Sequence, residues 1–97
     1  MKSFIPGNNE NICYLCGRWC AVTHSHHCLH GRNRKLAEQD GLKVNLCPDC
    51  HRKLHDKGFG DLYLEQIAEE TWIKVNNSNV EGFIARYGKN YLEEVDK

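Results

Sequence analysis

The chain has no long apolar run, no net charge and no internal repeat or low-complexity tract. No stretch approaches the ~20 apolar residues that a bilayer-spanning helix needs, so we expect a soluble protein without a membrane partner. No apolar signal segment follows Met1, which favours a reducing compartment. A length of 97 residues predicts one domain, 1–97, that core burial alone does not easily stabilise.

Charge is balanced over the whole chain but divided along it. Residues 11–58 carry eight Lys or Arg against four acidic residues, whereas residues 59–97 carry four against eight. A basic part that faces phosphates would explain this division. Small domains also segregate charge to this extent by chance, so the pattern favours neither explanation by itself.

Cysteine is abundant, and four of the six cysteines form two C-x-x-C pairs. Cys13, Cys16, Cys47 and Cys50 follow the spacing C-x2-C-x30-C-x2-C. Each pair pre-orients two thiolates and two pairs complete a tetrahedron, so the pattern predicts a structural zinc ion that also stabilises the small core. A redox dithiol is the alternative, but it usually occurs as one C-x-x-C in a βαβ context, which is missing here.

Two cysteines lie outside these pairs. Cys20 and Cys28 would form another metal site if His24 or His30 joined them. The alternative, which we favour, is that they are small buried apolar side chains.

Histidines supply a second ligand set. Pro48 suits the first turn of a helix, on which His51 and His55 would lie on one face, about 6 Å apart along the axis. The His26-His27 pair can supply a third imidazole. Three imidazoles leave open positions on a divalent ion, as a catalytic site requires. The alternative is a zinc-finger variant without chemistry.

Residues 13–58 predict a zinc-containing core in the order strand, loop, strand, helix. The expected elements are a strand at 21–28, two helical turns at 34–40 that Gly41 ends, a strand at 42–46 and a helix from Pro48. Residues 1–11 are polar and predict a loose lead-in.

Residues 59–97 predict a C-terminal helical extension. Asp61 is a plausible N-cap, and a capping-box pattern at 78–81 opens a second helix. The apolar positions at helical spacing are Leu64, Ile67, Ala68, Thr71, Trp72 and Val75 in the first helix, and Phe83, Ile84 and Tyr87 in the second. We expect both helices to pack on the core as a scaffold, which makes the fold α+β.

The order H-H, a loop and then L-C-x-x-C-H-x-x-x-H resembles the HNH endonucleases. The wider string HHCLHGRNRKLAEQDGLKVNLC is similar to small HNH proteins encoded by bacteriophages, and the tail FIARYGKNYL resembles their ends. The resemblance implies a ββα-metal (HNH) core at 13–58 with two C-terminal helices packed on it. It also implies a metal-dependent endonuclease that hydrolyses DNA phosphodiester bonds in the cytoplasm of a bacterium or a phage-infected host cell.

The resemblance also implies roles for single residues. His26 would ligate a catalytic Mg²⁺, Mn²⁺, Ni²⁺ or Zn²⁺ ion together with His51 and His55, and His27 would be the general base. Neighbours in a strand point to opposite sides, so the strand end must twist to bring His27 beside the ion. The four-cysteine zinc would clamp the hairpin to the helix.

One family position departs from the pattern. The middle Asn, which holds the base histidine, falls on Leu42 in this chain. Asn33 and Asn45 are the available substitutes, and we favour Asn33 because it lies in the loop that follows the base. The candidate DNA contacts are Arg32, Arg34, Lys35, Arg52 and Lys53.

Two other functions fit the same residues. One is a non-catalytic zinc-stabilised DNA-binding module, which has no need for His27 beside an open metal site. The other is a zinc-ribbon adaptor that binds protein partners through its acidic helical half. The sequence does not indicate the oligomeric state.

Overall fold

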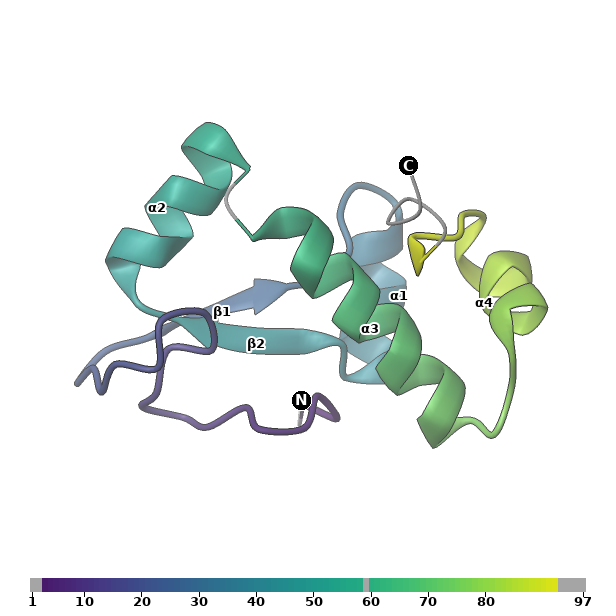
Figure 1. The fold of residues 1–97 in the computed structure, drawn as a ribbon, viewed down its shortest axis with the longest axis horizontal. Coiled ribbons are helices and arrows are strands. Elements are labelled where there is room, and N and C mark those ends of the chain that lie inside the picture. Colours follow the sequence, from purple (N-terminus) through teal and green to yellow (C-terminus); the bar gives the residue numbers. More distant parts are fainter. Residues whose placement is uncertain (1–2, 59, 93–97) are drawn as a thin grey trace.

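Two short strands and four helices form the chain in the computed structural model, which describes residues 3–58 and 60–92. The elements are β1 (His24–His27), α1 (Asn33–Asp40), β2 (Lys43–Leu46), α2 (Pro48–Lys57), α3 (Asp61–Val75) and α4 (Val80–Tyr87) (Figure 1). The predicted α+β class is confirmed at this level. Within the described residues, none of the helices has the length and apolar character needed to cross a membrane.

The two strands pair antiparallel and determine which histidines share a face. His24 lies opposite Leu46, and His27 lies opposite Lys43. Because side chains alternate along a strand, His24 and His26 point to one face of β1 and His27 to the other. The strand is shorter than the one predicted at 21–28, while α1 occupies the loop in which the sequence predicts two helical turns.

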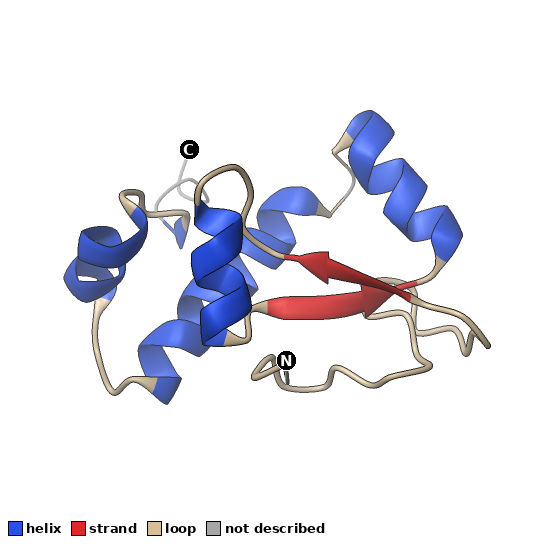
Figure 2. Ribbon diagram, turned by 180° about the vertical axis from the view of Figure 1, so that it is seen from behind, coloured by secondary structure: helices blue, strands red, loops and turns tan. Residues whose placement is uncertain are grey.

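The N-terminal residues pair with β2 and its flanks. The Phe4 amide donates to the Gly41 carbonyl at 2.8 Å, and the Asn8 side-chain oxygen accepts from the Asn45 amide at 2.8 Å. Ile5 is buried in the core. The prediction of a loose lead-in is therefore wrong for residues 3–11, because this segment runs along the strands (Figure 2) and hydrogen-bonds to β2 and Gly41.

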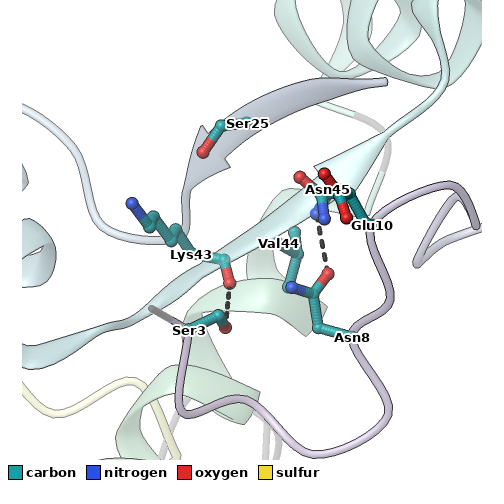
Figure 3. Close-up of a pocket in the computed structure, with 7 residues that line it drawn as sticks. All are labelled: Ser3, Asn8, Glu10, Ser25, Lys43, Val44 and Asn45. Carbon is teal, nitrogen blue, oxygen red and sulfur yellow. Dashed lines mark hydrogen bonds between the residues drawn. The ribbon is translucent and has the colours of Figure 1, made fainter. Parts of the chain in front are cut away.

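The N-terminal segment and the strands border an open hollow of about 490 Å³. Its lining residues are Ser3, Asn8, Glu10, Ser25, Lys43, Val44 and Asn45 (Figure 3). Because none of them is a histidine or a cysteine, the hollow does not contain the metal-ligating chemistry that the sequence predicts.

The two C-terminal helices pack through aromatic side chains. Trp72 of α3 meets Phe83 and Tyr87 of α4 edge to face, with ring centroids 5.7 and 6.4 Å apart. Leu64 and Ala68 are fully buried on the same side of α3, as their helical spacing predicts. Two other predicted core positions are wrong, because Val75 and Ile84 are 53% and 39% exposed.

Both helix starts differ by one residue from the prediction. Gly60, with a left-handed φ of 78°, is the N-cap of α3, and Asp61 is its first helical residue. Asn79 caps α4, since its side-chain oxygen accepts from the Gly82 amide at 2.8 Å. An Asn side chain reaches the amide three residues on as well as Ser does, so the capping-box pattern does not identify the cap.

Polar contacts fasten α4 to α1. The Arg86 guanidinium donates to the Asp40 carboxylate at 2.6 Å, and the Tyr87 hydroxyl donates to the same carboxylate. The Asn33 side-chain amide donates to the Tyr87 carbonyl at 3.0 Å. The helical extension therefore packs on the core, as predicted, and leaves the opposite end of β1 and the whole of α2 uncovered by α4 (Figure 1).

Candidate metal centre

The four cysteines of the two C-x-x-C pairs lie together and can hold a structural metal ion such as zinc. Their sulfur atoms, from Cys13, Cys16, Cys47 and Cys50, all lie within 4.8 Å of one another. The Cys16 and Cys47 sulfurs are 3.9 Å apart, close to the edge of about 3.8 Å that a tetrahedron with Zn–S bonds of ~2.3 Å has. The predicted grouping of these cysteines is therefore confirmed.

Backbone amides support this cluster from both pairs. The Cys16 amide points at the Cys13 sulfur at 3.5 Å, and the Cys50 amide points at the Cys47 sulfur at 3.4 Å. A hydrogen bond from the Arg18 backbone amide lowers the pKa of Cys16 to about 6, which favours the thiolate form that binds metal ions. Burial raises the pKa of Cys50, and such a thiol loses its proton when a cation binds.

The two remaining cysteines do not join a metal cluster within the described residues. Cys28 is fully buried, and burial raises its pKa to about 12. Cys20 is partly buried against the core. The burial of both residues agrees with the interpretation that they are small apolar side chains of the core.

Three imidazoles form a second cluster at the junction of β1 and α2. His26 comes from β1, while His51 and His55 come from successive turns of α2. One ring nitrogen from each lies within 4.8 Å of the others, and the Nε2 atoms of His51 and His55 are 3.1 Å apart. Nitrogens that share a tetrahedral ion at ~2.0–2.1 Å lie about 3.3 Å apart, so this separation suits a common cation.

Burial keeps the central imidazole neutral. His26 is only 5% exposed, and this burial, aided by His30, His51 and His55, lowers its pKa to about 4. Burial also lowers the pKa of His51, followed by the effects of His55 and His24. Neutral imidazole is the form that ligates metal ions. Both imidazoles are therefore neutral at pH 7, as metal coordination requires.

A buried nitrogen of His26 supports cation binding more directly. Its Nε2 atom has no hydrogen-bond partner within residues 3–58 and 60–92. An unsatisfied buried polar atom costs about 1–3 kcal/mol, and a bound cation would remove this cost. The cluster therefore fits a divalent ion.

His24 supports the cluster, a role that the sequence analysis missed. Its Nδ1 lies 2.9 Å from the Nδ1 of His51, so this contact holds the His51 ring with Nε2 turned towards His55. Metal-ligating histidines commonly have their second nitrogen held in this way. The alternation of β1 could have revealed His24, because it shares a face with His26.

His27 opens into the same depression as the three imidazoles. This depression, which we call the histidine pocket, has a volume of about 280 Å³. Its lining residues are Ser25, His26, His27, His30, Arg34, His51 and His55. Both histidines of the pair therefore line one pocket, although they alternate along β1.

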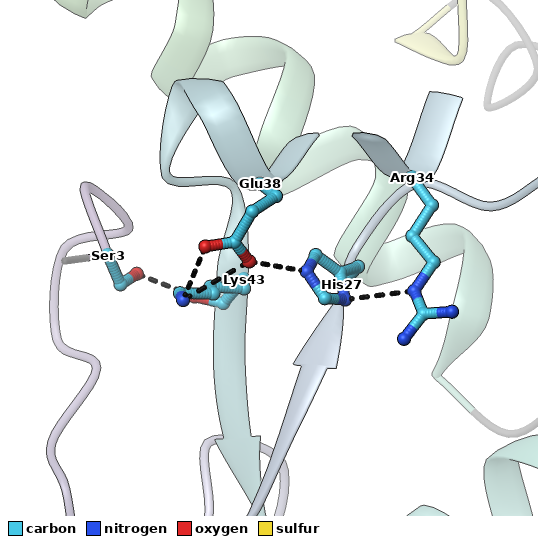
Figure 4. Close-up of polar contacts among 5 residues, drawn as sticks. All are labelled: Ser3, His27, Arg34, Glu38 and Lys43. Carbon is cyan, nitrogen blue, oxygen red and sulfur yellow. Dashed lines mark hydrogen bonds and ion pairs between the residues drawn. The ribbon is translucent and has the colours of Figure 1, made fainter. Parts of the chain in front are cut away.

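Two residues of α1 hold the His27 ring (Figure 4). Its Nε2 lies 2.7 Å from a carboxylate oxygen of Glu38, and its Nδ1 accepts from the Arg34 side chain at 3.4 Å. Glu38 also pairs with Lys43 at 3.2 Å, and both contacts, that of His27 first, lower the pKa of its carboxylate. The proton of a neutral His27 therefore lies on Nε2, which leaves the lone pair on Nδ1.

The contacts of the two candidate asparagines differ from the expected one. Asn33 donates to the Tyr87 carbonyl, and the Asn45 side chain donates to the Asn9 carbonyl at 3.0 Å. Neither makes a hydrogen bond to His27, which Glu38 and Arg34 hold instead. The sequence gives no direct sign of Glu38, because its contact depends on how α1 packs against β1.

The predicted DNA-contacting residues are all exposed but do not form one patch. Arg34 lines the histidine pocket, whereas Arg52 and Lys53 line a depression beside the four cysteines. Arg32 lies near Gly88 at the end of α4. The structure thus places Arg34 at the pocket, whereas Arg32, Arg52 and Lys53 line other depressions.

No family model matches the chain, and neither does any curated protein or solved structure. Function must therefore be inferred from the chain's own residues and their geometry.

Proposed function

We propose that the chain is a metal-dependent endonuclease of the HNH type that hydrolyses DNA phosphodiester bonds. The observation that carries this proposal is the convergence of His26, His51 and His55 within 4.8 Å, with His27 opening into the same pocket. A purely structural site surrounds its ion, whereas three imidazoles in an open pocket leave positions for water and a phosphate oxygen.

The order of the elements supports the proposal. The resemblance implies a ββα-metal core, in which an antiparallel strand pair is followed by a helix that supplies ligands. In this chain β1 and β2 pair antiparallel, and α2 follows β2 directly and carries His51 and His55. The four cysteines lie at the start of α2, where a zinc ion would join that helix to the segment before β1.

Each residue of the pocket has a separate role in the proposed reaction. Once Arg34 leaves Nδ1 of His27 to bind a phosphate oxygen, that nitrogen takes a proton from the attacking water, and Glu38 keeps the ring in the required tautomer by accepting from Nε2. Arg34, at the edge of the pocket, is placed to bind a phosphate oxygen. The ion bound by His26, His51 and His55 would stabilise the departing 3′ oxygen.

One observation favours a non-catalytic DNA-binding module instead. Arg18, Arg52 and Lys53 line a depression of about 300 Å³ beside the four cysteines, away from His27. A protein that only binds the DNA backbone needs such a basic surface and no open imidazole site.

A plasmid-cleavage assay separates these functions. The wild-type protein, loaded with zinc at the cysteines and supplied with Mg²⁺, Mn²⁺, Ni²⁺ or Zn²⁺, should nick or linearise supercoiled plasmid. A chelator should stop the reaction, and His51→Ala should abolish cleavage while zinc stays at the cysteines. DNA binding without cleavage under every metal tried would select the binding module.

A further inference from the structure

His30 and Asp61 form a pair at the histidine pocket that the proposed reaction does not use. His30 lies in the loop after β1, and Asp61 is the first residue of α3. The Nε2 atom of His30 lies 2.6 Å from a carboxylate oxygen of Asp61. The two residues are 31 positions apart in the chain, so the packing of α3 against this loop brings them together.

This pair lies next to the buried imidazole of His26. The ring centroids of His26 and His30 are 5.4 Å apart, the same distance as those of His26 and His51. One ligand atom from each of His26, His30 and Asp61 lies within 4.8 Å of the other two. The unpaired Nε2 of His26 adds a buried atom that lacks a partner among the described residues.

We propose that His26, His30 and Asp61 form a second divalent-cation site beside the histidine pocket. Two imidazoles and one carboxylate are ligands that suit Zn²⁺ or Co²⁺ and leave a fourth position for water. The partial exposure of His30 and Asp61, whose side chains are 42% and 34% exposed, lets an ion enter from solvent.

The other histidine–carboxylate pair of the pocket gives a natural comparison. His27 and Glu38 are joined by a contact of similar length, 2.7 Å. No third metal-ligating side chain in the described part of the chain lies close enough to complete a cluster with them. Both pairs are hydrogen-bonded, so that contact does not distinguish His30 and Asp61 from His27 and Glu38. The difference is the ligand atom of His26, which lies close enough to complete a cluster only with His30 and Asp61.

The two cation sites exclude each other because both need His26. A neutral imidazole has a single lone pair available to a metal, since its other nitrogen carries the proton. One ion can therefore bind either with His51 and His55 or with His30 and Asp61. The second position would join α3 to the loop after β1, and it would leave His51 and His55 without their ion.

Cobalt binding to zinc-loaded protein tests this site separately from any nuclease activity. Co²⁺ is titrated into variants whose four cysteines already hold zinc, and uptake is followed by calorimetry and by the visible absorption of Co²⁺. Thiolate-to-cobalt absorption would reveal any exchange into the cysteine site. We expect one Co²⁺ in the wild type and one in His51→Ala/His55→Ala, where only the second site remains.

Further substitutions in the double variant identify the ligands. Adding Asp61→Asn or His30→Ala should reduce its Co²⁺ affinity by at least about tenfold. Adding Glu38→Gln, the matched change in the other pair, should leave it unchanged. The single variant His55→Ala, which removes an exposed ligand, provides a second background if the double variant does not retain its zinc and helical circular dichroism.

Two outcomes would overturn the site. The first is absence of Co²⁺ binding in both folded backgrounds, and the second is Co²⁺ binding that Asp61→Asn leaves unchanged. Two Co²⁺ ions per wild-type chain would instead overturn the mutual exclusion of the two sites. Because the readout is ion binding, a protein that fails to cut DNA can still pass this test.

Discussion

A carboxylate oxygen of Glu38 accepts a hydrogen bond from Nε2 of His27 at 2.7 Å. This carboxylate reaches the ring from α1, while His27 itself lies at the end of β1. Lys43, opposite His27 in the sheet, pairs with the other side of the same carboxylate. His27, Glu38 and Lys43 thus form a chain of polar contacts across three elements, which holds the His27 ring where it lines the histidine pocket.

We expect Glu38→Gln to lower DNA cleavage by about tenfold, the lower limit for outer-shell partners of catalytic groups. A Gln amide can rotate to present either an oxygen or a nitrogen, so the ring tautomer is no longer fixed. Single-turnover cleavage rates and nitrogen NMR shifts of His27 measure both effects.

Asn33→Ala is the comparison, because Asn33 is the residue that the HNH resemblance places in the same role. It should leave the cleavage rate within a few-fold of wild type and cost about 1 kcal/mol of stability through its lost bond to the Tyr87 carbonyl. A larger rate loss in Asn33→Ala than in Glu38→Gln would return the positioning role to Asn33.

The local pairs within the candidate ligand clusters were predictable from the sequence, because short-range spacing determines them. Two C-x-x-C pairs each place two thiolates on one turn, and an i, i+4 pair places His51 and His55 on one helix face. These relations hold whatever the rest of the chain does. The meeting of the two cysteine pairs, with Cys16 and Cys47 31 positions apart, was predicted from the chemistry of zinc, because a tetrahedral ion needs four ligands. The α+β class follows from strand alternation and helical spacing.

The supporting contacts were not predictable, because they depend on how separate elements pack. Glu38 reaches His27 only through the packing of α1 against β1, and Asp61 reaches His30 across 31 positions of the chain. The N-terminal segment likewise pairs with β2 through Asn8, although its polar composition is typical of a loose end. Short-range periodicity contains no information about such docking.

The cysteine cluster predicts a metal stoichiometry. We expect about one tightly held zinc per chain, and Cys47→Ser or Cys50→Ser should release it and unfold the protein, because the small core depends on the ion. Cys20→Ser, which changes a cysteine outside the cluster, should keep both zinc and fold. Elemental analysis with circular dichroism measures these effects. A folded, metal-free protein with Cys13 in a disulfide would contradict this prediction.

The buried His26 predicts how stability depends on pH. Its pKa is about 4 in the folded chain, below the ordinary value of 6.5, so the unfolded chain binds more protons between these values. The unfolding free energy should therefore decrease as pH falls from 6.5 to 4, by on the order of 2 kcal/mol, and this contribution should be constant above 6.5.

Urea unfolding of wild type and His26→Gln across this pH range isolates the effect, with zinc held at the cysteines in both proteins. The difference in unfolding free energy between them should change over this range, because only the wild type has the buried imidazole. Parallel curves from pH 7 to pH 4 would mean that His26 is not the titrating group.

His27 predicts the clearest separation of an enzyme from a binding module. If its Nδ1 takes a proton from water, His27→Ala should reduce cleavage by roughly 10²–10⁴-fold, the usual contribution of a positioned base. Affinity for DNA and for the catalytic cation should stay nearly the same, since His27 contacts Glu38 and Arg34 and the three proposed ligands are other residues. His27→Gln is the matched variant: its amide can still donate to Glu38, yet it cannot take up a proton. It should therefore be as slow as His27→Ala. Cleavage rate and cation affinity, measured on the same proteins, decide the role of His27. An unchanged rate with weakened cation binding would make His27 a metal ligand, and the general base would then be His24 or His26.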